Sequence, residues 1–401
     1  MARFRRTPAT AGSHALAGEH QVTIFERLDD MARRAGRLDP AGPAIAVFCT
    51  VLALLALGFL IQVSHASTTV RPEAFRAEVL SLLGFRLLGL FVLLVGFRLG
   101  PQGVRPLIPA LTWIVLLMLV AVYVPGLSAV KNGSRRWLEL PFLDLTVQPS
   151  EIARVVIVLW VASRCVQLGP RLQDMRRGYM PMLCFGTFLF GLILGEPDLG
   201  GALLFFLCFV CTMWVGGARP AHVAGSLGML GGGALVLGAT MLAYVRERIA
   251  VWMGESTNEQ VLLTVRAMAS GDMFGVGLTH GGARNSGVQY MQTDFALSLV
   301  GEELGFLGIT VVLGLLFTYI WFSLRFVLSI RDRYRALVAF GLLVSVAFQA
   351  MLHVQVVTGL APPKGMNLPF ISDGGSSLVA SCLAVGLALG AVRGAGKTSG
   401  S

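Results

Sequence analysis

The sequence is poor in charged residues, which make up 13% of its 401 residues, against about 25% in an average soluble domain. Hydrophobic residues make up 55% of the chain, and its mean hydropathy is +0.73. These values exclude a soluble globular enzyme, a disordered chain and a nucleic-acid-binding module. Runs of about 20 apolar residues recur along most of the length, as bilayer-spanning helices require. The composition therefore indicates one polytopic membrane domain.

Several motifs of other protein classes are missing. The six cysteines lie in or beside apolar runs without the spacing of a metal site or a disulfide framework, so they are interpreted as core residues. The absence of a P-loop motif leaves a nucleotide-driven pump unsupported. The first apolar run begins only near Pro43, which is too late for a cleavable signal peptide. Residues 1–43 are expected to form a basic cytoplasmic tail, and residues 394–401 a short cytoplasmic tail.

Apolar runs predict an all-α polytopic membrane domain over residues 44–393, with about ten transmembrane helices. An even number of spans places both termini on one side, and the Arg-rich N-terminal tail makes that side the cytoplasm. The expected spans are 44–64, 77–97, 105–125, 150–168, 180–195, 200–217, 223–244, 296–322, 336–357 and 376–393.

Two outer loops carry more arginine and lysine than this topology predicts. They are loop 126–149 and the large loop 245–295 between the seventh and eighth helices. Their cations either bind phosphate or pyrophosphate head groups at the outer membrane surface or are solvated loop charges. Loop 245–295 is too long for a simple connector, so it is expected to pack back on the helices.

The first polar stretch surrounds the expected start of a helix at Pro149. It contains Arg136 upstream and the segment Gln148-Pro-Ser-Glu-Ile-Ala-Arg154. Pro149 suits the first position of a helix, and Ser150 is a possible cap. Glu151 and Arg154 then share a helix face. They form either a local ion pair or a positioned carboxylate and a phosphate-binding cation.

Carboxylates follow in two further stretches. Asp198 of Glu196-Pro-Asp-Leu-Gly200 is interpreted first as the cap of a turn. Asp294 opens a long apolar span, where it either caps the helix, as Thr293 also could, or acts as a general base. Glu302 and Glu303 lie about two turns into the same span, and they are expected to face protein or water, or to lie close to the membrane boundary.

The last polar stretch runs from Lys364 to Ser377 and ends in Gly-Gly-Ser-Ser before an apolar span. Ser376 and Ser377 offer hydroxyl donors at the positive end of a helix, which suits an anion. The same small residues also permit close helix packing. Composition alone does not separate these two interpretations.

Taken together, these stretches resemble the SEDS family of bacterial cell-wall polymerases, which includes FtsW, RodA and SpoVE. The resemblance covers about residues 44–393, and Pro363-Lys-Gly365 is closest to the FtsW or SpoVE pattern. Three segments depart from the family: Gln289 to Gln292 replace Pro-Glu-Ala-His, Asp373 replaces an aromatic residue, and Leu263-Thr264 replaces Gln-Ser. The matching motifs, in family order, are Asn132-Gly-x-x-Arg-Trp137, Gln148-Pro-Ser-Glu151, Pro197-Asp-Leu-Gly200, Thr293-Asp-Phe295 with Gly301-Glu-Glu-Leu-Gly305, and Gly374-Gly-Ser-Ser377.

The resemblance implies a peptidoglycan glycosyltransferase that polymerises lipid II at the outer face of the bacterial cytoplasmic membrane, with a role in cell division. It implies that Asp294 is the base in one inverting displacement. Candidate substrate-binding residues are Arg136, Arg154 and Lys364 as pyrophosphate cations, Gln148 and Glu151 as positioning groups, and Ser376 and Ser377 as anion donors.

The resemblance also implies ten membrane helices with both termini in the cytoplasm, and a class B penicillin-binding protein as partner beside other divisome proteins. Membrane lipid and the lipid-linked glycan chain are further expected ligands, whereas nucleic acid is not. No metal-ligand set is visible in the sequence, although pyrophosphate chemistry makes Mg²⁺ or Mn²⁺ plausible. Two alternatives remain: a flippase for lipid-linked precursors, which predicts a polar path through the helices, and a non-catalytic scaffold, in which Asp294 is dispensable.

Overall fold

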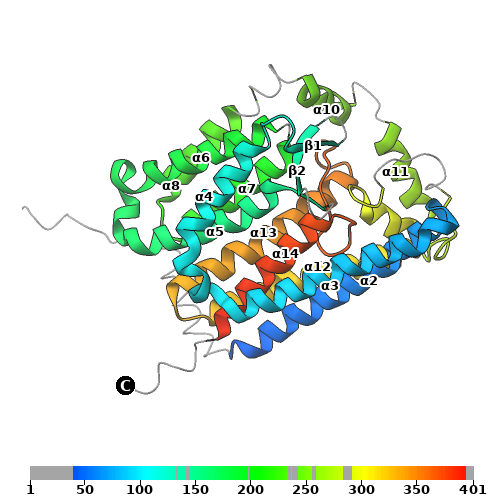
Figure 1. The fold of residues 1–401 in the computed structure, drawn as a ribbon, viewed down its shortest axis with the longest axis horizontal. Coiled ribbons are helices and arrows are strands. Elements are labelled where there is room, and N and C mark those ends of the chain that lie inside the picture. The colour runs from blue at the N-terminus through cyan, green and yellow to red at the C-terminus, as the bar shows by residue number, and fades with distance from the viewer. Residues whose placement is uncertain are drawn as a thin grey trace, which may run out of the picture.

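The structure is a computed structural model, and Figure 1 shows a bundle of long helices with a small sheet near one end. It describes residues 39–131, 134–140, 145–196, 198–233, 236, 243–254, 259–282 and 291–393. The predicted tails lie outside these residues, apart from residues 39–43. The main helices are α2 (Ala41–Thr69), α3 (Pro72–Val104), α4 (Ile108–Ala121), α5 (Pro149–Leu168), α6 (Met180–Gly195), α7 (Leu199–Val215), α12 (Ala296–Ser329), α13 (Arg333–Val357) and α14 (Gly375–Leu389).

Seven helical segments of the described residues are long and apolar enough to cross a bilayer, so the chain is a multi-pass membrane protein. One of them, Pro72–Ala121, has 50 residues and covers two expected spans. This segment is interrupted at Gly100, which has a φ of 59° and is followed by Pro101. The expected span 200–217 matches the shorter helix α7, with 17 residues. The expected span 223–244 begins with α8 (Pro220–Ser226), and part of it lies outside the described residues. The number ten therefore stays a prediction.

Helix α13 occupies the centre of the bundle. It packs against α5, α7, α12 and α14, while α2 lies along α12 and α3 lies along α14. Glycine allows α3 and α14 to approach closely, because a Cβ at Gly386 would lie 2.2 Å from the carbonyl oxygen of Leu93. Close backbone contact of this kind stabilises membrane helices, which gain little hydrophobic energy from association in lipid.

The prediction of an all-α chain is wrong within loop 126–149. This segment forms a three-stranded antiparallel sheet in the order β1-β2-β3, with β1 at Ser128–Lys131, β2 at Ser134–Leu140 and β3 at Leu145–Val147. Lys131 pairs with Ser134, which leaves only Asn132 and Gly133 between the strands. Asn-Gly is the strongest short sequence signal for a β-hairpin, so the error came from treating this stretch as a loop.

The large loop 245–295 packs back on the bundle, as predicted, but it is more regular than a loop. It contains most of α10 (Ala243–Met253) and all of α11 (Glu259–Ser270). Helix α11 packs against α12 and α13. The indole nitrogen of Trp252 on α10 donates a hydrogen bond of 3.2 Å to the carbonyl oxygen of Gly359. These contacts bring the loop over the segment that joins α13 to α14.

A break in α12 receives the segment after α11. Gly305 has a φ of 66° inside the helix, and the amides of Val276 and Gly277 donate to the carbonyl oxygens of Glu302 and Glu303 at 3.0 and 3.1 Å. A Cβ at Gly275 would lie 2.1 Å from the Glu303 carbonyl oxygen, so this approach requires glycine. The first turns of α12 are thereby fixed, and with them the residues just before the helix.

Both glutamates of α12 face protein, as predicted. The side chains of Glu302 and Glu303 are each 1% exposed. The Ser64 hydroxyl of α2 donates to Oε1 of Glu303 at 2.8 Å, and the amide of Thr279 donates to the Ser64 oxygen at 2.8 Å. This network ties α2, α12 and the large loop together at one end of the bundle.

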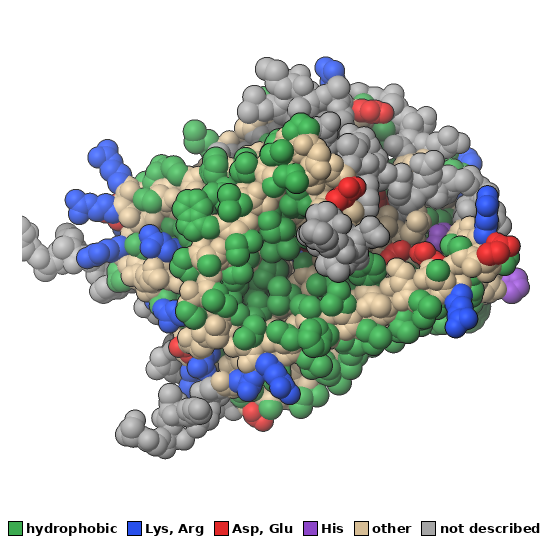
Figure 2. All heavy atoms as spheres, viewed as in Figure 1, with side chains coloured by type: hydrophobic (Ala, Val, Ile, Leu, Met, Phe, Trp, Pro, Cys, Tyr) green, Lys and Arg blue, Asp and Glu red, His purple; other side chains and the backbone are tan. Residues whose placement is uncertain are grey.

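Charged side chains separate along the long axis of the molecule (Figure 2). Lys and Arg side chains gather at the left end and along the lower left, and a broad hydrophobic band covers the middle. Arg171, Arg176 and Arg177, between α5 and α6, are exposed members of the basic end. Helices that expose hydrophobic side chains to lipid and arginines beside the bilayer follow the pattern of membrane proteins.

Candidate functional site

Asp294 lies directly before α12, at the end of the bundle that carries the sheet. The N-cap position of α12 is Phe295, and it has no side-chain cap. The alternative prediction, that Asp294 or Thr293 is the N-cap residue of α12, is therefore wrong. A Cβ placed on Gly365 would lie 2.6 Å from Oδ2 of Asp294, so the carboxylate lies against the backbone of the α13–α14 segment.

Three charged groups from other elements act on the Asp294 carboxylate. Burial raises the pKa of Asp294 above its usual range, while a hydrogen bond from Thr293 and the charges of Arg136 and Arg248 oppose this rise, and Asp198 adds to it. Arg136 belongs to β2, and Arg248 belongs to α10. A carboxylate with a raised pKa is a stronger proton acceptor than an exposed one, once it is ionised.

Asp198 binds several of the polar groups near Asp294. Its Oδ1 accepts the amide of Gly201 at 2.9 Å, which confirms the predicted cap, now at the start of α7. Its Oδ2 accepts hydrogen bonds from Nε2 of Gln148 at 3.0 Å and from the Ser150 hydroxyl at 3.4 Å. Nη1 of Arg136 lies 3.6 Å from Oδ1. Ser150 therefore binds Asp198, whereas the N-cap residue of α5 is Gln148, without a side-chain cap.

Lys364 lies in the same charge cluster and is 8% exposed. Burial lowers the pKa of Lys364 to about 8, the charge of Asp198 opposes this fall, and Arg248 adds to it. Glu196, beside Asp198 in sequence, is 1% exposed. Burial and the Asp198 charge raise the pKa of Glu196 to about 9 against the opposing effect of Arg136. At neutral pH Glu196 is therefore protonated, and the net charge facing Asp294 is positive.

A second network begins one turn further along α5. Nη2 of Arg154 lies 2.8 Å from Oε2 of Glu151, which confirms the predicted shared face. Nη1 of Arg154 donates to Oε1 of Gln349 on α13. The Gln349 amide nitrogen donates to the Ser377 hydroxyl at 2.8 Å and to the Asn367 carbonyl oxygen at 3.1 Å. This network fixes the segment that carries Lys364 to α5 and α13.

The two serines before α14 contact different partners. Ser376 donates to the carbonyl oxygen of Thr146 in β3 at 3.0 Å, and Ser377 accepts from Gln349. The sheet is therefore attached to the start of α14 as well as to α5. Their expected role as anion donors stays a prediction.

Comparison with known proteins agrees with these motifs. Residues 44–395 match the FtsW/RodA/SpoVE family of cell cycle proteins. The chain belongs to this family. The predicted resemblance is thus confirmed over nearly the whole described part of the chain.

Individual relatives point the same way. The chain is 31% identical over 353 residues to a probable peptidoglycan glycosyltransferase FtsW of Trichlorobacter lovleyi, covering 86% of this chain and 92% of that protein. It is 35% identical over 296 residues to stage V sporulation protein E of Bacillus subtilis, covering 70% of this chain and 79% of that protein.

Solved structures share the fold. One chain, from a study of how a peptidoglycan synthase complex coordinates polymerization and crosslinking, gives a TM-score of 0.69 at 25% identity, with 86% of this chain and 96% of that chain covered. The rod shape determining protein RodA of Thermus thermophilus gives a TM-score of 0.63 at 24% identity, with 86% and 95% covered.

Two residues important to the geometry were missed in the sequence. Gln62 of α2 is 2% exposed, and its amide nitrogen donates to the carbonyl oxygens of Gln292 at 2.9 Å and Ile371 at 3.2 Å. The Ser372 hydroxyl donates to the Thr293 carbonyl oxygen at 2.7 Å. A glutamine inside an apolar run is costly in a bilayer, and this cost was the signal that could have identified Gln62.

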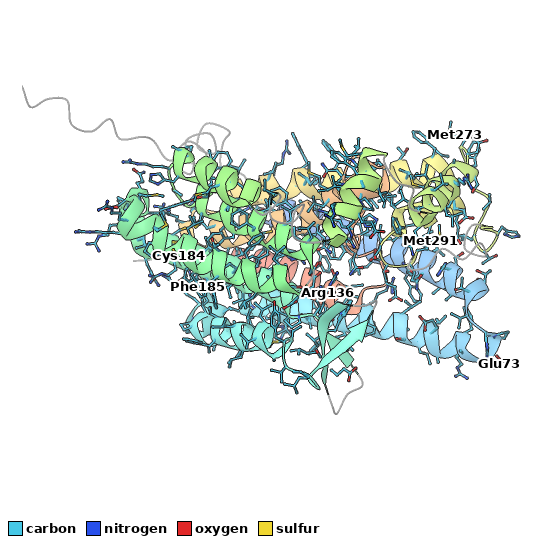
Figure 3. All side chains as sticks on the ribbon, turned by 90° about the horizontal axis from the view of Figure 1, so that it is seen from above. Glu73, Arg136, Cys184, Phe185, Met273 and Met291 are labelled. Atoms are coloured by element: carbon cyan, nitrogen blue, oxygen red, sulfur yellow. The ribbon has the colours of Figure 1, made fainter. Side chains whose placement is uncertain are left out.

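The residues that depart from the family pattern before Asp294 fit the structure through their backbone. The carbonyl oxygen of Gln292 accepts hydrogen bonds from Gln62 and from the amide of Asp373 at 2.9 and 3.0 Å, contacts that any residue could make. Met291 is fully buried. Figure 3 places Arg136 where the sheet meets the helices, apart along the long axis from Phe185 of α6. Gln289 and Tyr290 lie outside the described residues.

The described residues offer few ligands for a divalent metal ion. In the part of the chain that the structure describes, no group of three His, Cys, Asp or Glu side chains is arranged to hold a metal ion. Asp198 already accepts hydrogen bonds from three groups and contacts Arg136. The side chains alone therefore do not fit a dedicated metal site.

Proposed function

We propose that this protein is an inverting peptidoglycan glycosyltransferase that polymerises lipid II at the outer face of the cytoplasmic membrane, in cell division. Its family membership supports this activity, and its relatives include proteins named as glycosyltransferases of this kind. The observation that carries the mechanism is the position of Asp294, whose carboxylate lies against the segment that carries Lys364 and is acted on by the charges of Arg136 and Arg248.

The reaction needs a base and a means of stabilising a leaving pyrophosphate. The acceptor sugar hydroxyl loses its proton to Asp294 as its oxygen attacks the anomeric carbon of the donor. The bond between that carbon and the pyrophosphate breaks, and the lipid pyrophosphate leaves with both electrons of the bond. One displacement converts an α-linked donor into a β-linked product. General-base catalysis of this type contributes about 100- to 10,000-fold.

Arg136 and Lys364 are the cations best placed for the leaving pyrophosphate. Arg136 lies at the edge of the cluster with 19% of its side chain exposed, and its Nη1 lies 3.6 Å from Oδ1 of Asp198. Lys364 lies beside Gly365, against which the Asp294 carboxylate packs. Arg248 of the large loop joins them through its charge. Cations preorganised around developing negative charge lower a barrier without rearranging during the reaction.

The remaining candidates act behind these groups. Arg154 is 2% exposed and is held by Glu151 and Gln349, so we assign it a positioning role for the Lys364 segment. Gln148 orients Asp198 in the same way. Ser376 and Ser377 fix the start of α14 and remain candidate anion donors.

A divalent cation is compatible with this proposal only if the substrate supplies most of its ligands. Mg²⁺ is often bound by one or two carboxylates together with substrate phosphates. In this chain Asp294 and Asp198 are the acidic side chains beside the proposed pyrophosphate position. Such an ion would neutralise phosphate charge, and Asp294 would keep the proton-accepting role.

The arrangement in the membrane follows from the charge distribution. We place the basic end of the bundle and both termini in the cytoplasm, and the sheet and large loop outside, with about ten spans in all. A class B penicillin-binding protein is the proposed partner, together with other divisome proteins. One structural relative comes from a study of polymerization and crosslinking by a synthase complex, which supports such a partnership.

Substitution of Asp294 by Asn tests the catalytic role. Asn has a similar size but is a far poorer proton acceptor. We expect Asp294→Asn to fold, insert and bind lipid II, yet to lose glycan synthesis by about 100-fold or more. The assay measures glycan strands made from labelled lipid II by the purified protein, with its partner if the partner is required.

Asp272→Asn is the matched control. Asp272 is exposed in the same large loop and has a φ of 45°, a conformation that Asn adopts readily. The control should retain polymerisation within about twofold. Near-normal synthesis by Asp294→Asn would contradict the mechanism and favour a scaffold or a lipid flippase.

A further inference from the structure

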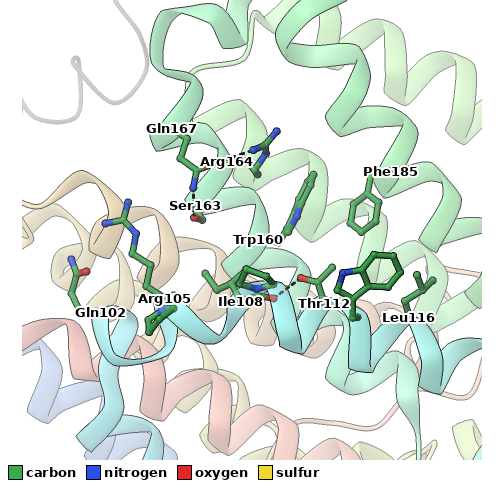
Figure 4. A pocket seen from close by; sticks show the side chains of 13 residues that line it. Gln102, Arg105, Ile108, Thr112, Leu116, Trp160, Ser163, Arg164, Gln167 and Phe185 are labelled. Atoms are coloured by element: carbon green, nitrogen blue, oxygen red, sulfur yellow. Dashed lines mark hydrogen bonds between the residues drawn. The ribbon is translucent and has the colours of Figure 1, made fainter.

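A groove opens between α4, α5 and α6 (Figure 4). It lies along the C-terminal half of α5, whereas the proposed active site lies at the start of that helix. Its volume is about 670 Å³, which lies within the range of small-molecule sites, about 300–1,000 Å³. Gln148 and Arg164 are both on α5, 16 residues apart, so a rise of about 1.5 Å per residue separates them by about 24 Å. The lining residues are Gln102, Arg105, Pro106, Ile108, Pro109, Thr112, Trp113, Leu116, Trp160, Ser163, Arg164, Gln167 and Phe185.

The groove is apolar at one end and polar at the other. Trp160, Ser163, Arg164 and Gln167 follow the spacing of one face of α5. Toward the middle of the bundle, Trp160 faces Phe185 of α6 with ring centroids 4.6 Å apart. Toward the basic end, Arg164 and Gln167 lie within the last turns of α5. An amphipathic molecule fits this gradient with its polar group at the basic end.

Two arginines lie at the polar end, and none of the described residues that line the groove is acidic. The guanidinium of Arg105 is positioned over the ring of Tyr334 at 4.7 Å. Nη1 of Arg164 donates to Oε1 of Gln167 at 3.1 Å, and Nε2 of Gln167 donates to the Ser163 hydroxyl at 3.3 Å. Each guanidinium has five N–H donors, so both arginines retain donors for an anionic group.

We propose that this groove binds an anionic phospholipid, with its phosphate between Arg105 and Arg164 and an acyl chain along Trp113, Trp160 and Phe185. The exposure of Trp113, at 66%, opens the apolar end toward the surrounding lipid. Anionic lipids are attracted to basic residues beside the membrane, and Arg105 and Arg164 supply that attraction at the polar end of the groove.

Quenching of tryptophan fluorescence tests this site, because Trp113 and Trp160 line the groove. Phosphatidylglycerol with brominated acyl chains is titrated into the purified full-length protein in a neutral detergent, and brominated phosphatidylcholine is titrated in parallel. We expect phosphatidylglycerol to bind about 10- to 30-fold more tightly, because two arginines favour a lipid of net negative charge, whereas the choline cation of phosphatidylcholine offsets the charge of its phosphate. Equal affinity for the two lipids would overturn the proposal.

Three pairs of substitutions assign the preference to the groove. Arg105→Gln with Arg164→Gln should abolish the preference, whereas Arg105→Lys with Arg164→Lys should retain most of it. Arg171→Gln with Arg176→Gln is the control, because these arginines are exposed at the same end but do not line the groove.

Two results would contradict the assignment even if phosphatidylglycerol is preferred. A control pair that loses as much preference as the groove pair would indicate attraction by the whole basic end. Displacement of the lipid by millimolar glycerol 3-phosphate would show that soluble phosphate is the ligand. Asp294 lies outside the groove, so failure of this proposal leaves the proposed polymerase activity untouched.

Discussion

Substitution of Lys364 by Arg should change the pH profile of polymerisation in a defined way. Burial lowers the pKa of Lys364 to about 8, and the proposed role in pyrophosphate binding needs the charged form. Raising the pH through this value removes the charge from the free enzyme. Arginine keeps its charge throughout the accessible pH range, so the variant separates loss of charge from all other effects of alkaline pH.

The expected magnitude follows from the titration of one group. At pH 9, one unit above a pKa of about 8, about a tenth of Lys364 is protonated. The wild-type kcat/KM for lipid II should therefore be about tenfold lower at pH 9 than at its maximum. Lys364→Arg should lose less than about twofold over the same interval, whatever its absolute activity, because kcat/KM reports groups of the free enzyme.

The assay measures initial rates of glycan synthesis at low lipid II concentration between pH 6 and 9.5, with each profile normalised to its own maximum. Glu196 also titrates in this range, since burial raises its pKa to about 9, and Glu196→Gln removes that contribution. Neither substitution replaces Asp294, so the comparison is confined to the alkaline limb. An alkaline limb that is unchanged in Lys364→Arg would refute the role of Lys364 and assign the limb elsewhere.

Two further substitutions test the contacts that hold the site together. Gln62→Leu removes the side-chain donor of the Ile371 carbonyl oxygen and one of the two donors of the Gln292 carbonyl oxygen, which keeps the amide of Asp373. Loss of the buried contact to Ile371 costs about 1–3 kcal/mol, so the midpoint of thermal unfolding in detergent should fall and polymerisation should decrease. An unchanged midpoint would contradict a positioning role. Gln349→Leu removes the acceptor of the buried Arg154 guanidinium and should reduce lipid II polymerisation more than Ser377→Ala, measured in the same assay; the reverse order would favour a direct role for Ser377.

Helices were predictable from the sequence because the bilayer imposes a simple rule. An apolar run long enough to cross the membrane must satisfy its backbone hydrogen bonds internally, so hydropathy locates it. The rule does not apply to the polar segments between such runs, where the sheet within 126–149 and helices α10 and α11 were expected only as loops. Their formation depends on contacts with distant segments, such as that between Trp252 and Gly359.

The sequence predicted which residues could belong to the candidate site, but not which of them would contact one another. Lys364, Arg136 and Asp294 stood out because charged groups beside apolar spans are costly unless they have a function or a partner. Their convergence required the sheet, the large loop and the α13–α14 segment to meet at one end of the bundle. Arg154 looked equivalent to Arg136 in the sequence, and only the buried acceptor on α13, Gln349, separates a positioning cation from an accessible one.

The departures from the family pattern show why residue identity alone was a poor guide at this site. Gln292 replaces the expected histidine, yet its carbonyl oxygen alone contacts Gln62 and the amide of Asp373. Such contacts do not depend on the side chain, so a glutamine at position 292 makes them as well as a histidine would. At Asp373, in contrast, burial and the neighbouring Glu78 raise the pKa of the carboxyl, and the charge of Arg86 opposes this rise. The buried Arg86 of α3 therefore partly offsets the cost of an acid at this position. The aromatic residue usual in the family would give Arg86 no negative charge there.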